Sequence, residues 1–509
     1  MSSTTALVVG AGAGGVAVAA RLAKNGFQVT VVEKNRDIGG RCSMVNDNGY
    51  RFDQGPSLLL MPEYFREIFE DLDTTMETEG VELRKCDPNY RIWFSDRDTL
   101  DVTTDLVKMK SQIERYEGKS GFDGFLRFLV EAGRHYNLSS EHVLRKNFPS
   151  LSSMLRPDLV LVLWKLHPFE SIYSRVSRYY RSEKLRQAFT FASMYLGMNP
   201  FEAPGTYSLL QYTEFADGIW YPVGGFKTVI DALSRVGTRL GVKYRLNSPV
   251  SSIALSTDSK SVTGIYLESG ELLESDLVIV NADLTYAYNN LLPRTAYAES
   301  LEQRHTSCSC ISFFWSFNTT IPALQSHNVF LADEYRASFD AIFKHNTIPV
   351  HPSFYVHVPT RLDPSVAPRG MDAMVILVPV GHLGRRPLPG KENVKETNTH
   401  WDEIVSNTRR LVLNTIESRT GASLRDRLIA EKIETPLTWR EKYNLDRGSI
   451  LGLSHSFFNV LSFRPKICHP VIEGLLFVGA STHPGTGVPV CLAGSKIITV
   501  QYVVTTFGN

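Results

Sequence analysis

The feature that most constrains this chain is a cluster of glycines directly after a short apolar run near the N-terminus. Residues 6–9 read Ala-Leu-Val-Val, which predicts a short buried strand. Three glycines in the spacing G-x-G-x-x-G follow this run: Gly10, Gly12 and Gly15. In a strand–turn–helix unit the first glycine permits the tight turn, the second lets the backbone approach a pyrophosphate, and the third lets the helix pack against the strand. The spacing therefore predicts a dinucleotide site in an α/β domain.

The residues that follow complete this unit. Residues 16–23 predict a helix that ends at Asn25-Gly26, and residues 28–32 predict a second strand that ends in Glu33. The N-terminus of such a helix offers free N–H groups and a partial positive charge to a diphosphate. An acid 18 residues after Gly15 can hold the hydroxyls of a ribose, which suits FAD or NAD and not NADP. The alternative is an ordinary glycine-rich turn without a ligand.

A pair of adjacent glycines later in the sequence indicates which dinucleotide binds. Gly39-Gly40-Arg41 comes shortly after Glu33, and residues 53–57 (Asp-Gln-Gly-Pro-Ser) come next. A plain NAD domain would continue with a helix and a strand. A glycine pair with an arginine near the pyrophosphate instead resembles the GG-doublet flavoproteins, which hold FAD. Only one complete fingerprint is present, so the sequence does not support a second pocket for NAD.

Composition narrows the class of protein. The 509 residues are 43% hydrophobic and 21% charged, with a net charge of +1, which is typical of a globular protein and gives no reason to expect nucleic acid. No secretory signal opens the chain, and no apolar stretch is long enough to span a bilayer. Six cysteines include no C-x-x-C pair, and Cys308 and Cys310 lie in a strand-like run. We expect buried thiols, no metal site and a reduced, intracellular protein.

Strand and helix signals divide the chain into five segments, and the fold class that they predict is α/β. We expect a discontinuous FAD-binding domain that is Rossmann-like and carries the GG doublet. A helical domain is inserted into it, and a substrate domain with a mixed β-sheet completes the chain. The predicted segments are 1–108 (cofactor domain, first part), 109–217 (helical), 218–295 (cofactor domain, second part), 296–440 (substrate domain) and 441–509 (cofactor domain, third part, with a last helix over 491–507). The predicted strands of the later segments cover 242–244, 250–255, 262–267, 277–280, 311–317, 353–359, 374–380 and 474–479.

By these motifs the chain resembles the phytoene desaturases of the bacterial and fungal kind, and the fungal enzymes most closely. The residues that carry the resemblance are 9–15, 32–35, 39–42, 50–57, 166–172, 207–212, 218–222, 224–226, 280–284 and, most specifically, 478–489 (Val-Gly-Ala-Ser-Thr-His-Pro-Gly-Thr-Gly-Val-Pro). The resemblance implies FAD, the C40 polyene phytoene as substrate, and successive desaturations to lycopene or 3,4-didehydrolycopene. Fungal members continue past the last helix into a membrane anchor, so either this chain is shorter by nature or its tail lies beyond Asn509.

The resemblance also implies which residues bind the cofactor. They belong to the N-terminal unit, to the segment after the glycine pair, to a strand start in the middle of the chain and to the C-terminal loop. These residues are Gly10, Gly12, Gly14, Gly15, Glu33, Lys34, Gly40, Arg41, Pro56, Ser57, Val250, Gly479, Ala480, Gly487, Val488 and Pro489. The loop precedes a helix whose N-terminus can stabilise negative charge on the flavin or the pyrophosphate.

Desaturation of an unactivated hydrocarbon requires a hydride acceptor, which is a property of a flavin, and then loss of a proton from the adjacent carbon. The sequence leaves the catalytic proton acceptor unknown. His483, the one histidine of the C-terminal loop, is a weak candidate, and a structural role is the alternative. Asp53 is expected either to reach the ribityl chain or to cap a turn. Trp220 and Tyr221 are expected either to wall the cavity or to pack in the core.

Two other classes of function remain open on sequence: an amine-oxidase-type flavoprotein and a non-enzymatic isoprenoid-binding protein of related fold. The expected electron acceptor is a quinone or dioxygen, with NAD as the alternative. Because phytoene resides in bilayers, we expect peripheral contact with membrane lipid. Apolar residues 159–164 and the basic residues Lys165, Arg175, Arg178, Arg181, Lys184 and Arg186 form the candidate surface. A buried core helix beside a solvated basic face is the alternative.

Overall fold

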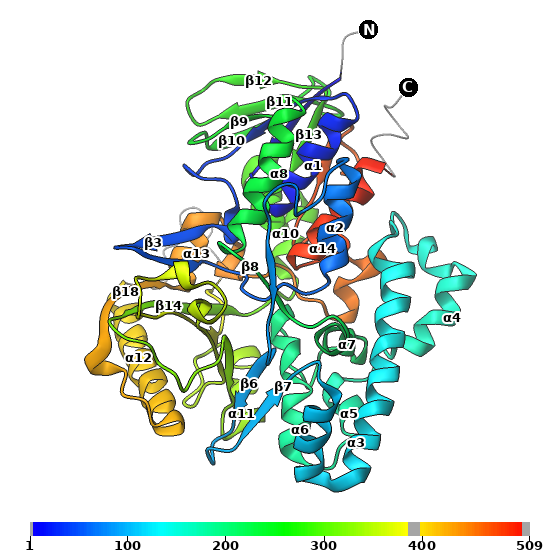
Figure 1. Ribbon diagram of the computed structural model, residues 1–509. Coiled ribbons are helices and arrows are strands. Elements are labelled where there is room, and N and C mark those ends of the chain that lie inside the picture. Colours follow the sequence, from blue (N-terminus) through cyan, green and yellow to red (C-terminus); the bar gives the residue numbers. More distant parts are fainter. Residues whose placement is uncertain (1–3, 385–397, 501–509) are drawn as a thin grey trace.

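A five-stranded parallel sheet forms the upper part of the molecule, as seen in the computed structural model, which describes residues 4–384 and 398–500 (Figure 1). Its strand order is β19 (Leu475–Phe477), β13 (Leu277–Val280), β1 (Thr5–Val9), β2 (Gln28–Val32) and β9 (Lys243–Arg245), and all neighbours are parallel. The sheet therefore joins strands from the beginning, the middle and the end of the chain. The runs of Val, Ile, Leu and Phe in β1, β2, β13 and β19 are buried on both faces, as expected for a parallel sheet covered by other elements, whereas the edge strand β9 is Lys-Tyr-Arg.

Helices from three distant parts of the sequence pack together on this sheet. They are α1 (Ala13–Lys24), α8 (Lys227–Arg239) and α14 (Val488–Ile498), with α2 (Pro62–Asp71) against α14. A three-stranded antiparallel sheet covers the opposite side, with β10 (Val250–Leu255), β11 (Val262–Leu267) and β12 (Leu272–Glu274) in order. The observed strands 250–255, 262–267 and 277–280 have the predicted bounds, whereas β12 carries no run of apolar residues and was missed.

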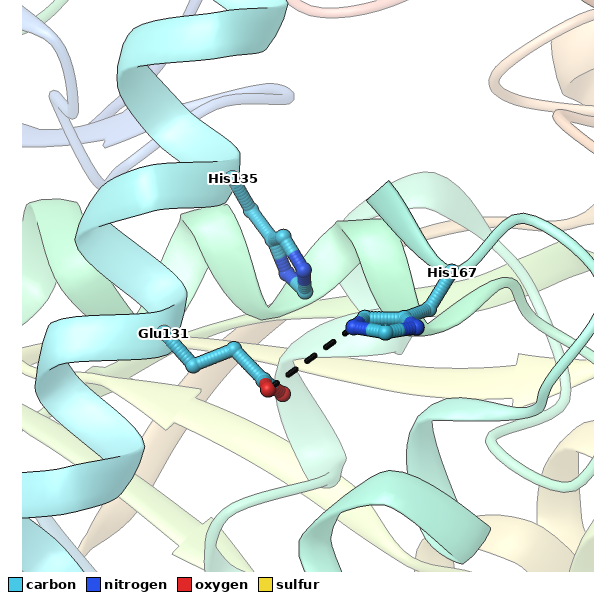
Figure 2. A group of neighbouring side chains, drawn as sticks. All are labelled: Glu131, His135 and His167. Carbon is cyan, nitrogen blue, oxygen red and sulfur yellow. Dashed lines mark ion pairs between the residues drawn. The ribbon is translucent and has the colours of Figure 1, made fainter. Parts of the chain in front are cut away.

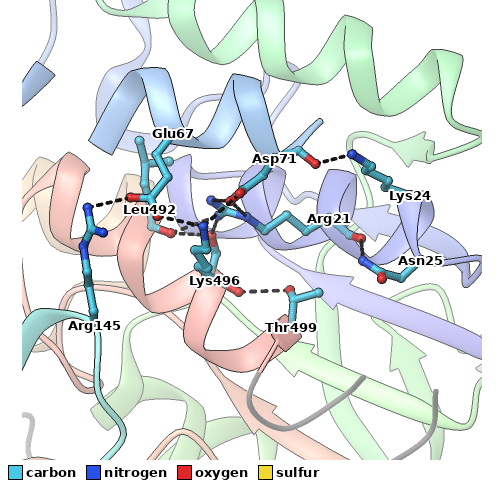
Figure 3. Close-up of polar contacts among 10 residues, drawn as sticks. Arg21, Lys24, Asn25, Glu67, Asp71, Arg145, Leu492, Lys496 and Thr499 are labelled. Carbon is cyan, nitrogen blue, oxygen red and sulfur yellow. Dashed lines mark hydrogen bonds and ion pairs between the residues drawn. The ribbon is translucent and has the colours of Figure 1, made fainter. Parts of the chain in front are cut away.

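Ion pairs fasten α1, α2 and α14 to one another (Figure 3). The Arg21 side chain on α1 is 5% exposed and donates to Asp71 Oδ2 on α2 at 2.7 Å and to the Leu492 carbonyl on α14 at 3.0 Å. Lys496 on α14 binds Asp71 Oδ1 at 2.8 Å and Glu67 Oε1 at 2.7 Å. Burial opposes ionisation of Asp71, but the hydrogen bonds from Lys496 and Arg21 outweigh it and lower the pKa of Asp71.

A seven-stranded mixed sheet forms the second layer. Its order is β18 (Leu428–Glu434), β14 (Ser309–Phe317), β17 (Ala373–Val380), β16 (Phe354–His357), β15 (His327–Phe330), β6 (Tyr90–Trp93) and β7 (Thr99–Val102). Only β15 and β6 pair in parallel. Helix α12 (Asn398–Thr420) packs on this sheet. Residues 90–102, which the predicted boundary at 108 assigns to the cofactor domain, belong to this sheet instead, because β6 pairs with β15 from far along the chain.

Residues 106–216 contain helices and no strand, as the sequence predicts. The helices are α3 (Leu106–Ser139), α4 (Pro157–Leu166), α5 (Ile172–Val176), α6 (Glu183–Ala188) and α7 (Leu209–Ala216), with short helical turns between them. The remaining elements are β3 (Met44–Asp47), β4 (Tyr50–Asp53), β5 (Leu83–Lys85), β8 (Trp220–Pro222), α9 (Leu284–Tyr286), α10 (Ala296–Gln303), α11 (Tyr335–Phe343) and α13 (Pro436–Tyr443). Across the described ranges, no helix combines the length and the apolar character needed to span a membrane.

The last helix differs from its prediction. The sequence predicts a helix from Cys491, whereas α14 begins at Val488, with Gly487 at its N-cap position and Pro489 in its first turn. A proline fits there because the first turn of a helix has no use for its missing N–H. The part of the predicted helix from 501 to 507 lies outside the described residues.

Candidate functional site

A cavity of about 840 Å³ extends from the glycine turn after β1 to the helical region. At one end its walls are backbone of the predicted dinucleotide motifs, including Gly10 and Gly12. At the other end the walls are apolar side chains such as Leu163 on α4, Phe191 and Leu209 on α7. One cavity thus joins a glycine-lined region to a hydrocarbon-lined region.

Two glycines of the first turn serve different physical needs. Gly12 is the N-cap residue of α1 and has φ −74°, a conformation that any residue can adopt, so the reason for a glycine is space: a Cβ there would lie 3.0 Å from Asn281 Nδ2, beside the cavity. Gly15 does not line the cavity. A Cβ on Gly15 would overlap the carbonyl oxygen of Gly10, so this glycine allows the close packing of α1 on β1, as the motif predicts.

Glu33 lies at the end of β2 beside the turn and lines the cavity while being 6% exposed. Its Oε2 accepts the backbone N–H of Ala11 at 2.8 Å, and its Oε1 accepts the N–H of Asn35 at 2.9 Å. These bonds fix the carboxylate at the edge of the cavity and leave further lone pairs for hydroxyl donors.

The glycine pair lies against the first turn. The Gly39 N–H donates to the Ala11 carbonyl at 2.8 Å, and a Cβ on Gly40 would lie 3.4 Å from Gly12 Cα. Both glycines have positive φ. Arg41 follows, lines the cavity and donates to the Ile450 carbonyl. The pair therefore brings an arginine next to the fingerprint, as the sequence predicts.

The C-terminal loop closes the other side of the glycine-lined region, and α14 starts at its end. A residue that sequence analysis missed holds this loop. Arg464 is 1% exposed and donates to the carbonyls of Ala480 and Thr482 and to three carbonyls of residues 453–459. Burial lowers the pKa of Arg464 to about 10. No sequence pattern marks this role, because its partners are backbone atoms.

The structure brings nearly all of the predicted cofactor residues to this one cavity. Apart from Gly15, every one of them lines it: Gly10, Gly12, Gly14, Glu33, Lys34, Gly40, Arg41, Pro56, Ser57, Val250, Gly479, Ala480, Gly487, Val488 and Pro489. They come from six separate stretches of the chain, so their convergence depends on the fold. That they hold a flavin remains a prediction.

His483 is not among the cavity residues. Its ring is buried, and its Nε2 donates to the Lys146 carbonyl at 2.7 Å. Burial lowers the pKa of His483 to about 4, so the ring is neutral at pH 7. The geometry therefore favours the structural role for His483.

Asp53, Trp220 and Tyr221 also lie outside the cavity lining. Asp53 is buried and accepts the backbone N–H of Phe226 at 2.8 Å, at the N-terminus of α8, and the Tyr221 hydroxyl at 2.8 Å. Asp53 thus caps a helix start rather than reaching the ribityl chain. Tyr221 packs in the core. Cys308 and Cys310 are buried thiols, as predicted, although both contact the cavity.

Three further side chains of the cavity were missed by sequence analysis. Tyr355 on β16 binds Ser57 Oγ at 2.7 Å and His327 Nδ1 at 2.6 Å. Tyr195 and His455 line the same cavity, and His455 Nε2 accepts the backbone N–H of Thr486 at 3.1 Å. Tyr195 and Tyr355 lie in apolar runs, which sequence alone cannot distinguish from core, and no motif marks His455, which lies between two serines.

One group of possible metal ligands lies near the cavity, on α3 and the loop after α4 (Figure 2). The ligand atoms of Glu131, His135 and His167 lie within 4.8 Å of one another. The Glu131 carboxylate, however, already accepts two hydrogen bonds from Arg175 and one from Tyr179. The guanidinium supplies the counter-charge that a cation would otherwise supply, so we assign no metal to this group.

The surface of α4 is apolar where the sequence predicts lipid contact. Leu161 is 72% exposed and Trp164 is 82% exposed. The residues of this α4 surface are Leu151, Leu155, Val160, Leu161, Trp164, Phe169 and Phe458. The expected basic face is wrong in part, because Arg175 is buried between Glu131 and Glu170, Arg178 pairs with Glu170, and Lys184 pairs with Asp96 and Asp98. Arg175 and Arg178 thus form ion pairs within the helical region, and Lys184 joins this region to the turn between β6 and β7.

Comparison with known proteins agrees with this architecture. The family described as flavin containing amine oxidoreductase matches residues 13–360. A phytoene desaturase of Fusarium fujikuroi is 56% identical over 97% of this chain and 88% of its own length. That of Neurospora crassa is 53% identical over 99% and 85%, and a zeta-carotene-forming phytoene desaturase of Myxococcus xanthus is 38% identical over 97% and 92%. Among solved structures, a putrescine oxidase variant superposes with a TM-score of 0.66 over 99% of this chain and 100% of its own, at 13% identity.

Proposed function

Because the chain belongs to the phytoene desaturases, flavin-containing oxidoreductases of carotenoid biosynthesis, we propose that it binds FAD and desaturates phytoene stepwise to lycopene or 3,4-didehydrolycopene. The observation that carries this proposal is the single cavity with a glycine-lined end and an apolar end. The glycine-lined end suits a soluble dinucleotide, and the apolar end suits a hydrocarbon.

The residues present fit FAD. Gly12 and Gly40 leave space for a pyrophosphate beside the N-terminus of α1, and Arg41 adds a positive charge there. Glu33 is the acceptor for ribose hydroxyls, and Val250 lines the cavity beside it. The C-terminal loop and the start of α14 form the opposite wall, where a helix N-terminus stabilises negative charge. When bound, the flavin supplies acceptance of a hydride, which no side chain of the protein can provide.

The apolar end is suited to a polyene. Phe191, Met194, Leu196, Leu209 and Leu210 line it and exclude water from the reacting carbons. Leu163, Leu166 and Pro168 line the cavity beside the α4 surface. We propose that this surface contacts the bilayer and that phytoene enters between it and the cavity, because a hydrocarbon then stays out of water throughout.

Pigment formation in a host that accumulates phytoene tests the function. Expression of the chain should convert colourless phytoene into coloured carotenoids, and chromatography of the extract identifies the end product. Purified protein should carry a flavin spectrum. Uncoloured extracts together with flavin-free protein would contradict the proposal and favour a non-enzymatic lipid binder.

The same purified protein tests the electron acceptor. We propose that a quinone or dioxygen reoxidises the flavin, because a second dinucleotide fingerprint is absent from the sequence. Phytoene conversion under nitrogen should depend on an added quinone. Formation of one NADH for each double bond, with NAD as sole acceptor, would contradict this part.

A further inference from the structure

A buried tyrosine–glutamate pair lies at the apolar end of the cavity, and hydride acceptance makes no use of it. Tyr195, in the helical turn Phe191–Leu196, lines the cavity. Glu214 on α7 lies next to the Tyr195 hydroxyl, does not line the cavity and is 0% exposed. On its other side, the Tyr90 hydroxyl of β6 donates to Glu214 Oε2 at 2.9 Å.

The Glu214 carboxyl is poised to exchange a proton. Burial raises the pKa of Glu214 to about 7, although the hydrogen bond from Tyr90 and the neighbouring Tyr195 hydroxyl work in the opposite direction. Its other oxygen, Oε1, is buried, and none of the residues that the structure describes supplies it with a partner at hydrogen-bonding geometry. A buried polar atom without a partner is unusual in a native protein. This oxygen is therefore an open acceptor next to a phenol that reaches the cavity.

Tyr195 lies near a second tyrosine of the cavity wall, Tyr355, which contacts the proposed cofactor site. Tyr355 is near enough to Tyr195 to raise its pKa, and the Tyr355 hydroxyl binds Ser57 Oγ at 2.7 Å. Ser57 belongs to the stretch after the glycine pair that is proposed to contact the cofactor. Tyr195 is thus linked through Tyr355 to Ser57, a residue of the proposed cofactor site.

The other basic groups of the cavity fit a proton acceptor less well. Glu33 lies at the glycine-lined end, where the nucleotide is proposed to bind. The lone pair of His455 Nε2 already accepts the Thr486 N–H, so the neutral ring carries its proton on Nδ1. Asp283 accepts the N–H of Tyr286 and caps α9.

We propose that Tyr195 and Glu214 together take up the proton released in each desaturation, an assignment that rests on the proposed function. One hydrogen of the CH–CH unit leaves with its bonding electrons to the flavin. The adjacent C–H bond then breaks, and its electron pair becomes the new π bond. The proton goes to the phenol oxygen of Tyr195 as the hydroxyl proton of Tyr195 moves to the Glu214 carboxylate. Tyr195 is the catalytic residue, and Glu214 acts through it as a positioning residue and proton store.

Kinetics of matched variants test this assignment. Glu214→Gln keeps the size of the side chain and cannot take a proton, and Tyr195→Phe interrupts the path. Both should bind flavin as the wild type does and should lower kcat for desaturation by about 100-fold or more, the usual contribution of a general base, with little change in KM. Glu214→Asp, which keeps a carboxylate, should recover part of the rate.

The pH profile separates proton uptake from a packing role. The described groups that act on the ionisation of Glu214 are Tyr90 and Tyr195, and Tyr335 acts on Tyr90. Since the ionised carboxylate is the acceptor, kcat should rise with pH through about 7. Tyr90→Phe removes a donor that favours the carboxylate, so it should move this inflection to higher pH while keeping the plateau. Glu214→Gln should abolish the inflection.

Infrared spectroscopy gives a readout that needs no turnover. In flavin-loaded wild type, a C=O band of a protonated carboxyl should appear as the pH falls through about 7, and Glu214→Gln should lack it. Wild-type kcat and an unchanged pH profile in both Glu214→Gln and Tyr195→Phe would overturn the assignment. So would the absence of a Glu214-dependent band in that pH range. If the wild type forms no carotenoid at all, the proposed function fails, and the infrared titration still decides whether Glu214 exchanges a proton.

Discussion

At the scale of single residues, two glycines of the fingerprint have different roles: we propose that Gly12 serves cofactor binding, whereas Gly15 serves folding. Gly12 has an ordinary φ and lies beside the cavity, whereas Gly15 is in contact with backbone of the preceding turn. The two positions are three residues apart and carry the same residue type, yet their substitutions should have different consequences. Substitutions at Gly12 and Gly15 can therefore serve as controls for each other.

We expect Gly12→Val to remain folded and to lose FAD, because the new side chain occupies the space proposed for the pyrophosphate. Gly15→Ala should lower the free energy of unfolding, because its Cβ would overlap the Gly10 carbonyl. Flavin absorbance for each mole of protein and denaturant unfolding measure the two effects. A folded Gly12→Val protein with one flavin per chain would contradict the proposed site.

Residues that act through short local motifs were predictable from the sequence, and residues that act through long-range contacts were not. The glycine turn and Glu33 follow from spacing and the C-terminal loop from the family resemblance, so the sequence identified them. Arg464 and Tyr195 gain their roles from backbone carbonyls and a cavity wall that only the folded chain assembles. His483 was a candidate only because it lies in the right loop, and its ring is directed to the Lys146 carbonyl instead.

At the scale of elements, hydrophobic patterning predicted the strands that are apolar or alternate, and missed strands in which polar residues interrupt the pattern, such as β15 and β18. Strands β1, β2 and β13 are buried on both faces, and their Val and Ile runs are unmistakable. Strand β18 (Leu-Ile-Ala-Glu-Lys-Ile-Glu) lies at a sheet edge and carries charged residues, and β15 begins His-Asn. Pairing with β14 and β16, rather than local sequence, determines these two strands.

The stability of the junction of α1, α2 and α14 should depend on the carboxylate of Asp71. Asp71→Asn leaves the buried Arg21 guanidinium without its counter-charge, so we expect a loss of about 2–4 kcal/mol in the free energy of unfolding at pH 7. Urea unfolding measures it. Asp37→Asn, which breaks the exposed pair with Arg36, is the control and should have no measurable effect.

The pH dependence of this junction has a definite sign. The pKa of Asp71 is lower in the folded protein than its ordinary value of about 4, so the folded state binds fewer protons. The stabilisation is complete above that ordinary value and is lost as the pH falls through the lowered one. The difference in stability between wild type and Asp71→Asn should therefore shrink in acid. A difference that stays constant down to the lowest pH would contradict the role of the ionised carboxylate.

At the scale of the whole molecule, the α4 surface determines how the protein meets a bilayer. Trp164 and Leu161 are exposed, whereas Leu159 and Val162 on the same helix are buried, so α4 has one outward apolar face. The helix lies at the edge of the molecule (Figure 1). Charges introduced on the outward face should leave the fold intact.

We expect Leu161→Glu with Trp164→Glu to reduce flotation with liposomes while FAD stays bound, because both side chains are in solvent in the isolated protein. The control is Val107→Glu with Val350→Glu, two exposed apolar residues outside the α4 surface, which should float like the wild type. Equal flotation of both double variants would contradict lipid contact at α4. Liposomes with and without anionic lipid, mixed with wild type, measure the share contributed by Lys165 and other cations.

The packing of α1 on α14 has a consequence for synthesis on the ribosome. Strand β1 pairs with β2, which is made soon after it, but α1 packs on α14, which is made more than 450 residues later. At ordinary elongation rates α1 waits on the order of a minute for α14. The face of α1 that α14 covers is exposed during that time, which is when apolar segments aggregate. We expect a chaperone to bind the segment of α1 on the nascent chain until α14 emerges.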